Sequence, residues 1–250
     1  MQLGLQEKRD SFPANFIRPE YWKQNMQLTS VVTPFTDDNL KLLSQIGVTH
    51  VTIRYPGPGL EKLQAIKTRV TACGLQIAAI EGYLPIENIK LGNERFDEEI
   101  AEMKSLLQNM QQAGIPFVCY NFMAGTDWVR TELKAPERGG AFVTGFDVEQ
   151  AEQAVSLSET TRDQESAPVT AEELWTNLKR FLQELLPVAE ACGVTLAMHP
   201  DDPPLDVFMG KARIMNTVES FERLMELSSS PAHGICFCQG TFAEMGVDIP

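Results

Sequence analysis

The sequence is poor in basic residues and contains no long apolar run. Its 250 residues carry 21 Lys and Arg against 34 Asp and Glu, a net charge of −13. Because this charge repels polyanions, nucleic acid and anionic membranes are excluded as main partners, and an anionic substrate would need a local cation. No stretch reaches the roughly 18 apolar residues of a membrane span, and the N-terminus lacks the apolar core of a signal peptide. We therefore expect a cytoplasmic protein with a small-molecule partner.

Disulfide frameworks and the common nucleotide-binding motifs are absent as well. The five cysteines are odd in number and lack the paired spacing of a disulfide framework or a zinc ribbon, so we interpret them as reduced thiols. The chain has no Gly-x-Gly-x-x-Gly fingerprint, P-loop, Gly-x-Ser-x-Gly elbow or His-Glu-x-x-His pair. These absences argue against dinucleotide enzymes, P-loop proteins, serine hydrolases of the elbow type and zincin proteases.

One local pattern occurs four times along the chain. An amphipathic helical stretch is followed by a small residue, a glycine and a short apolar run that ends in a polar residue. Each glycine fits the position after a helix, where a positive φ is needed, and each apolar run is typical of a strand buried on both faces. The copies span residues 45–54, 72–81, 112–121 and 191–200, and two further strands are expected within 26–33 and 234–240. This pattern predicts an α/β protein, a (β/α)8 TIM barrel of which the chain holds about six of eight units.

Three helices can be placed from local signals. One begins at Asp37 and Asp38, and another runs from about Thr217 to Leu227. A third has an apolar stripe between residues 100 and 110, and this assignment puts Glu99 on its solvent-facing side.

Two segments do not fit the repeat. Residues 1–25 are polar and are interpreted as an N-terminal extension to a barrel domain at 26–250. Residues 124–168 form a long insertion, rich in glycine and acidic residues, after the fourth predicted strand. Since TIM-barrel active sites lie at the carboxyl ends of the strands, we expect this insertion to form a lid over the site. A disordered surface excursion at 150–168 is the alternative.

Polar residues stand where the predicted strands end. The carboxyl ends of barrel strands converge at one face, so these side chains are expected to meet there. His50 and His233 instead begin strands and are assigned to the stability face. The strand-end residues are Arg54, Glu81, Asn121, His199 with Asp201 and Asp202, and Cys238 with Gln239.

His199 and Cys238 are candidate metal ligands. His199 ends one strand and Cys238 the next, so imidazole and thiolate could approach one ion from neighbouring strands. Cys236 and Cys238 are two residues apart and would face the same side of a continuous strand. Each residue also has a structural interpretation, His199 as a hydrogen-bonded histidine and Cys238 as a small buried apolar side chain.

The chain resembles the D-mannonate dehydratases. The resemblance rests on VCYNFMAGTDWVRTEL at 118–133, LAMHPDDPPL at 196–205, KARIMNT at 211–217 and FCQGT at 237–241. It implies a xylose-isomerase-like TIM barrel that dehydrates the sugar acid D-mannonate to 2-keto-3-deoxy-D-gluconate by β-elimination, in glucuronate catabolism. It also implies a divalent metal, with Mn²⁺ expected and Fe²⁺ or Co²⁺ as alternatives. A homo-oligomeric state is left open.

Site residues are carried over through the matching motifs. His199 and Cys238 are then metal ligands, whereas Glu81, Asn121, Arg130 and Asp201 are assigned to the substrate pocket.

Two departures from the family pattern stand out. This chain has IRYPGPG at 53–59 where the family usually carries a His-His-Ile-Pro type stretch. The family also continues for two more βα units, so the chain is expected to be incomplete, with the main acid and base residues beyond Pro250.

Two other functions remain open at the level of sequence. One is a sugar isomerase or epimerase of the xylose-isomerase-like barrels, although Cys238 fits their carboxylate-rich metal sites poorly. The other is a non-catalytic sugar-acid binding protein whose barrel has lost catalytic residues. Formation of a keto-deoxy acid from mannonate would separate these functions from a dehydratase.

Overall fold

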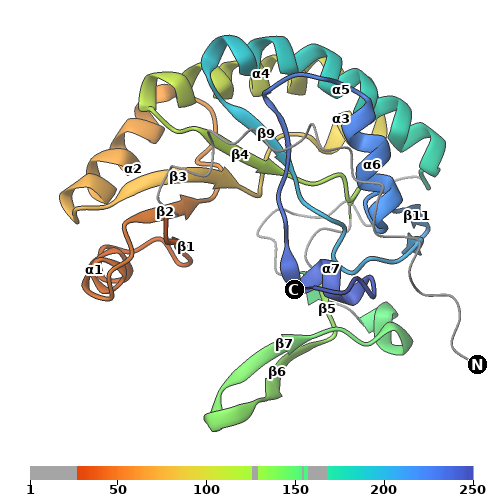
Figure 1. The fold of residues 1–250 in the computed structure, drawn as a ribbon, viewed down its shortest axis with the longest axis horizontal. Helices are drawn as coiled ribbons and strands as arrows, with labels where there is room; N and C mark the ends of the chain where they lie inside the picture. The colour runs from red at the N-terminus through yellow and green to blue at the C-terminus, as the bar shows by residue number, and fades with distance from the viewer. Residues whose placement is uncertain (1–26, 126–128, 154, 157–167, 250) are drawn as a thin grey trace, which may run out of the picture.

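A six-stranded parallel sheet organises the molecule. The computed structural model describes residues 27–125, 129–153, 155–156 and 168–249. The strands follow one another across the sheet in chain order, and all six predicted strands are present. The sheet is curved, and α2, α4 and α5 arch over its outer side (Figure 1). The strands are β1 (Thr29–Val31), β2 (His50–Ile53), β3 (Gln76–Glu81), β4 (Phe117–Tyr120), β9 (Thr195–Met198) and β12 (His233–Ile235).

Helix ends follow the local signals of the sequence. Thr170 caps α5 in a reciprocal capping box with Glu173, and Thr217 caps α6. Gly114 and Gly193 end α4 and α5 in the left-handed conformation, as the repeat predicted. The helices are α1 (Asp37–Gln45), α2 (Leu60–Ala72), α3 (Glu87–Leu91), α4 (Phe96–Ala113), α5 (Ala171–Cys192), α6 (Val218–Glu226) and α7 (Gln239–Glu244).

The core lies between the sheet and the helices that cover it. Phe181 of α5 is fully buried, and its ring centroid lies 5.0 Å from that of Tyr120 and 5.9 Å from that of Phe122. These contacts hold the end of β4 against the longest helix. The chain emerging from β4 therefore starts from a packed position.

The structure corrects two details of the sequence interpretation. Glu99 is buried, not solvent-facing, because its carboxylate accepts hydrogen bonds from the backbone N–H of Ile89 and from Asn88. The last strand ends at Ile235, and the Cys238 N–H bonds the Cys236 carbonyl at 2.9 Å. Cys236 and Cys238 therefore lie in a turn and not on one face of a strand.

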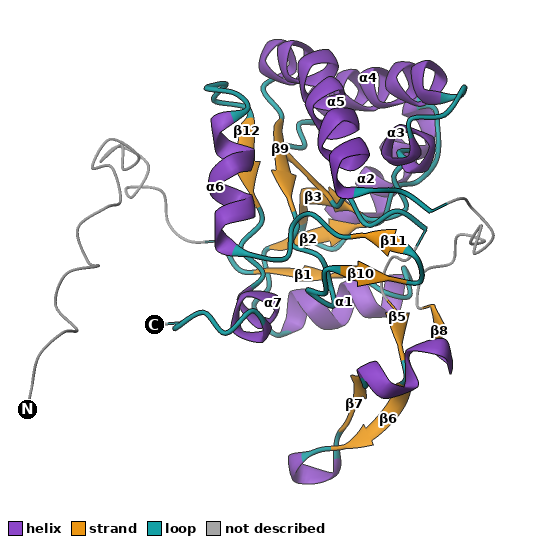
Figure 2. Ribbon diagram, turned by 90° about the vertical axis from the view of Figure 1, so that its right-hand side faces the viewer, coloured by secondary structure: helices purple, strands orange, loops and turns teal. Residues whose placement is uncertain are grey.

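The described part of the predicted insertion forms two small antiparallel ladders. β5 (Val129–Arg130) pairs with β8 (Val155–Ser156), and β6 (Glu132–Pro136) pairs with β7 (Phe142–Gly145). The β6–β7 hairpin projects from the body of the molecule in both views (Figure 2). The predicted extension at 1–25 and most of the proposed excursion at 150–168 lie outside the described residues.

Candidate metal and substrate site

The predicted strand-end residues lie along one edge of the sheet. Glu81 is the last residue of β3, and Arg54, Asn121 and His199 directly follow β2, β4 and β9. The ladder continues through this edge, because the His199 N–H bonds the Tyr120 carbonyl at 2.7 Å. Because the strands are parallel, the residues that end or follow them all lie at the same edge of the sheet.

His199 and Cys238 form the centre of the site. His199 directly follows β9, and Cys238 lies in the turn after the neighbouring strand β12, close enough for each side chain to shift the pKa of the other. The His199 Nδ1 lies 2.8 Å from the Pro200 carbonyl oxygen, which can only accept, so Nδ1 carries a proton. Burial lowers the pKa of His199, but the bond to Cys238 and the nearby thiols outweigh it and raise the pKa to about 9.

Cys238 has the properties of a reactive thiol. The bond to His199 lowers its pKa to about 7 against the opposing effect of burial. Thr241 also donates to its sulfur at 3.2 Å. Because a thiolate is the form that binds metal, this environment favours the ligand state. Among the described residues, however, no group of three or more His, Cys, Asp or Glu side chains could hold a metal ion.

Glu81 contacts one cation and one thiol. Its carboxylate accepts from Arg54 Nη1 at 3.4 Å and from the Cys119 thiol at 3.6 Å. Hydrogen bonding to Cys236 and burial raise the pKa of Cys119, so that thiol stays protonated. Glu81 therefore lies beside both Arg54 and the Cys119 thiol at this edge.

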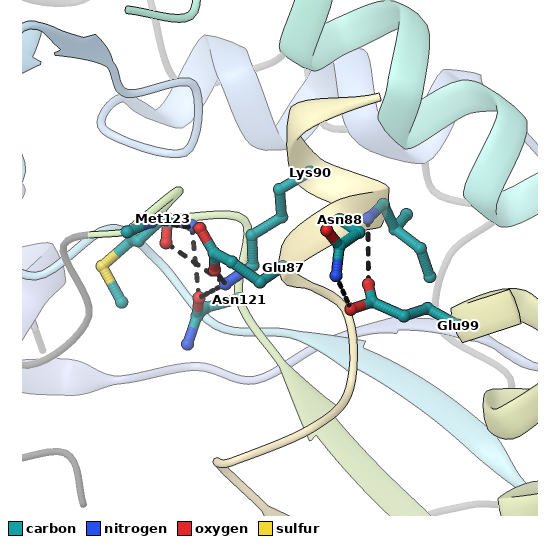
Figure 3. A network of polar contacts seen from close by, with 8 residues as sticks. Glu87, Asn88, Lys90, Glu99, Asn121 and Met123 are labelled. Carbon is teal, nitrogen blue, oxygen red and sulfur yellow. Dashed lines mark hydrogen bonds and ion pairs between the residues drawn. The ribbon is translucent and has the colours of Figure 1, made fainter. Parts of the chain in front are cut away.

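Asn121 is held by a residue that the sequence interpretation missed. Lys90 of α3 donates to the Asn121 Oδ1 at 3.1 Å and to the Met123 carbonyl at 3.2 Å (Figure 3). The available signal was the Glu87–Lys90 pair, spaced i, i+3 in a short apolar stretch after a strand end. A single helical turn is too short to reveal by periodicity which side a lysine faces.

Arg130 joins the insertion to the chain after β9. Its guanidinium binds both carboxylate oxygens of Asp202, at 3.1 and 2.8 Å. Both side chains are largely shielded from solvent, being 19% and 18% exposed. Arg130 therefore lies at this edge of the sheet.

Asp201 differs from the other predicted pocket residues because it has no exposed surface. Its Oδ2 accepts from the Met215 N–H at 2.7 Å. Burial raises the pKa of the carboxyl, and Arg213 opposes that shift. The contact ties the segment after β9 to the chain before α6.

Segment 53–59, which departs from the family pattern, is anchored to α4. The Tyr55 hydroxyl donates to Glu102 Oε1 at 2.5 Å. Burial, followed by that bond, raises the pKa of Tyr55. Gly59 has a φ of 102° and precedes α2.

No helix of the described residues is long and apolar enough to cross a membrane.

Comparison with known protein families shows to which family the chain belongs. The sequence model of the D-mannonate dehydratases matches residues 38–250. The chain belongs to the D-mannonate dehydratase family. A mannonate dehydratase of Streptococcus equi subsp. zooepidemicus is 37% identical over 201 residues, covering 74% of this chain and 55% of that protein. Mannonate dehydratase 1 of Bacillus licheniformis is 34% identical over 210 residues, covering 73% and 56%. This D-mannonate dehydratase family member therefore spans little more than half the length of these curated relatives.

Solved structures agree with the family and the fold class. The crystal structure of mannonate dehydratase from Streptococcus suis serotype 2 matches with a TM-score of 0.75 and 31% identity, covering 88% of this chain and 66% of that chain. A xylose isomerase-like TIM barrel protein from Mycobacterium smegmatis, in complex with magnesium, matches with a TM-score of 0.56 and 12% identity, covering 86% and 65%. The second likeness concerns the fold alone. The predicted α/β, TIM-barrel class of this D-mannonate dehydratase family member is confirmed.

Proposed function

We propose that this protein dehydrates D-mannonate to 2-keto-3-deoxy-D-gluconate with a divalent metal bound by His199 and Cys238. The observation that carries the proposal is the position of these two residues after the neighbouring strands β9 and β12, at the carboxyl edge of the sheet, in a member of the D-mannonate dehydratase family. Family membership supports the reaction. The His–Cys pair supports the metal.

The two donors fit such an ion. The Pro200 carbonyl holds the proton on His199 Nδ1, which leaves Nε2 as the ligand atom. Cys238, with a pKa of about 7, is readily ionised. Nitrogen and sulfur donors suit Fe²⁺, Co²⁺ and Zn²⁺ better than Mn²⁺. The choice of Mn²⁺ rests on the family resemblance, and Fe²⁺ and Co²⁺ are the alternatives. When bound, the metal would stabilise the negative charge that develops on substrate oxygens.

The remaining residues would bind and orient the sugar acid. In the reaction a proton leaves C2, a hydroxide leaves C3, and the resulting enol becomes the 2-keto acid. We assign Glu81, Asn121 and Arg130 to the substrate pocket because they lie at the same edge as the His–Cys pair. Asp201 is assigned to positioning the pocket through Met215. The acid and base of the elimination are not among these assignments.

A direct assay tests the proposed reaction. The protein, expressed from its entire reading frame and loaded with Mn²⁺, is incubated with D-mannonate, D-altronate and D-gluconate, and the 2-keto-3-deoxy acid is measured colorimetrically. We expect product from D-mannonate. Product from none of the hexonates would refute the dehydratase, and conversion of a ketose in its place would point to the epimerases of this fold.

A further inference from the structure

Lys90 is a buried cation at the edge of the candidate site. It is 4% exposed, although it belongs to a residue type that is almost never buried without partners. Its ammonium is shared between Asn121 Oδ1 at 3.1 Å, the Met123 carbonyl at 3.2 Å and Glu87 Oε2 at 3.3 Å. Two of these three contacts are to the segment that follows β4.

The helix that carries Lys90 is itself held on two sides. Glu99 of α4 accepts from the Ile89 N–H at 3.0 Å, next to Lys90. Asn177 of α5 donates to the Lys90 carbonyl at 2.9 Å. Contacts from both neighbouring helices therefore fix the position from which the lysine extends.

A second contact of α3 holds the far end of the same segment. The Glu87 carboxylate that pairs with Lys90 also accepts from the Gly125 N–H. Residues 121–125 are thus bound at both ends by one helical turn, and Figure 3 shows the contacts of Lys90 with Asn121 and Met123. This segment connects β4 to the insertion.

These contacts determine which side of the Asn121 amide faces Lys90. Oδ1 accepts from Lys90 and from the Met123 N–H at 3.2 Å, so the oxygen is committed to the protein. The amide nitrogen lies on the side turned away from Lys90 (Figure 3). A primary amide held this way presents N–H donors, not its acceptor, to the other side.

We infer that Lys90 is a positioning residue that holds Asn121 as a hydrogen-bond donor to an oxygen of the anionic substrate. The inference rests on the proposed function and assigns a role within the same site. A cation on the amide oxygen also polarises the amide, which strengthens its N–H groups as donors. Lys90 acts on the substrate through Asn121 and does not touch it.

Variants of both residues test this role in the metal-loaded protein. Lys90→Met keeps the aliphatic chain and removes the ammonium, and we expect kcat/KM for D-mannonate to fall about 10- to 100-fold. Asn121→Ala removes the donor and should cost about 100-fold or more. In the Asn121→Ala background Lys90→Met should cost less than about threefold further, because residues that act as a unit are not additive. Lys67→Met, which removes an ammonium on α2 that donates to the Ala113 carbonyl of α4, should leave kcat/KM unchanged.

A second variant separates the donor from the fold. Asn121→Asp keeps an oxygen for Lys90 and replaces the N–H donors by another acceptor. We expect it to unfold at or above the wild-type temperature and yet lose as much kcat/KM as Asn121→Ala. Wild-type activity in Asn121→Asp, or full additivity of Lys90→Met and Asn121→Ala, would overturn the positioning role while leaving the dehydratase intact. Absence of turnover by the wild type would overturn both.

Discussion

The chemistry of His199 depends on a neighbour in sequence as much as on one in space. The Pro200 carbonyl can only accept, and its contact with Nδ1 therefore keeps a proton on that nitrogen, so that Nε2 is the ring nitrogen that can bind a metal. The sequence predicted both residues from their places at strand ends. It could not predict the turn at Cys236–Cys238, because a strand that continues to Cys238 and a strand that ends earlier in a turn would show the same apolar pattern.

Removing either proposed ligand should release the metal. We expect His199→Ala and Cys238→Ala each to raise the Kd for Mn²⁺ more than about 100-fold, since even partners outside the coordination sphere are worth 10- to 100-fold. Isothermal titration and elemental analysis after dialysis measure the loss. His50→Ala and Cys192→Ala serve as matched controls remote from this edge. Unchanged metal content in either ligand variant would remove that residue from the proposed site.

His233 should make stability depend on pH. Its Nε2 lies 2.9 Å from the Leu224 carbonyl, and burial lowers its pKa below the ordinary value despite that bond. The unfolded chain therefore binds a proton more readily than the folded one. The contribution of neutral His233 is fully present above the unfolded pKa, about 6.5, and is lost as the pH falls through the folded value.

A comparison with His233→Asn isolates this contribution. The free energy of unfolding, measured by urea titration, should fall further between pH 8 and pH 5.5 in the wild type than in the variant. An equal or larger fall in the variant would show that other groups carry the pH dependence.

Among the helices and strands, the sequence predicted those with a full period of pattern. The glycine-then-apolar repeat located the sheet, because a buried parallel strand needs a continuous apolar run and a positive-φ residue before it. The five-residue α3 was missed, since Glu87–Leu91 is barely longer than one turn. The burial of Glu99 was missed for a related reason: its partners belong to α3.

Gly92 should be sensitive to substitution beyond its backbone conformation. It ends α3 at φ 65°, ψ 28°, and a Cβ there would lie 2.6 Å from the Asn177 Nδ2. Gly114 ends α4 at φ 70°, ψ 34°, and a Cβ at that position would have nothing within 4 Å. Gly114→Ala should therefore cost only the strain of a left-handed residue, about 1 kcal/mol, and Gly92→Ala at least 1 kcal/mol more.

Denaturant titrations of the two variants measure that difference. The additional loss at Gly92 arises because Asn177 must move and its bond to the Lys90 carbonyl is strained. Equal losses at the two glycines would show that Asn177 can adjust freely and that α3 is not fixed from α5.

At the scale of the whole molecule, the described part of the insertion contacts the body through an ion pair and an aromatic pair. The β6–β7 hairpin carries exposed apolar side chains, among them Phe142 at 66%, and projects away from the core (Figure 2). It is linked to the body through β5, where Arg130 binds Asp202 in a bidentate pair, and through Phe146, whose ring centroid lies 5.6 Å from that of Phe208. The sequence predicted the insertion from its length and position but could not predict this pair, whose members are 72 residues apart.

Breaking that pair should loosen the hairpin while the barrel core stays folded. A charge-assisted hydrogen bond at a mostly shielded site is worth roughly 1.5–3 kcal/mol, so Arg130→Met and Asp202→Asn should each speed tryptic cleavage at Lys134 and Arg138 about 10-fold or more. The double variant should be cleaved no faster than the worse single one, since no charge then remains buried without its partner. Arg95→Met, which removes an exposed pair with Glu98, is the matched control and should not change the rate. Cleavage at the wild-type rate in both single variants would mean that other contacts hold the insertion in place.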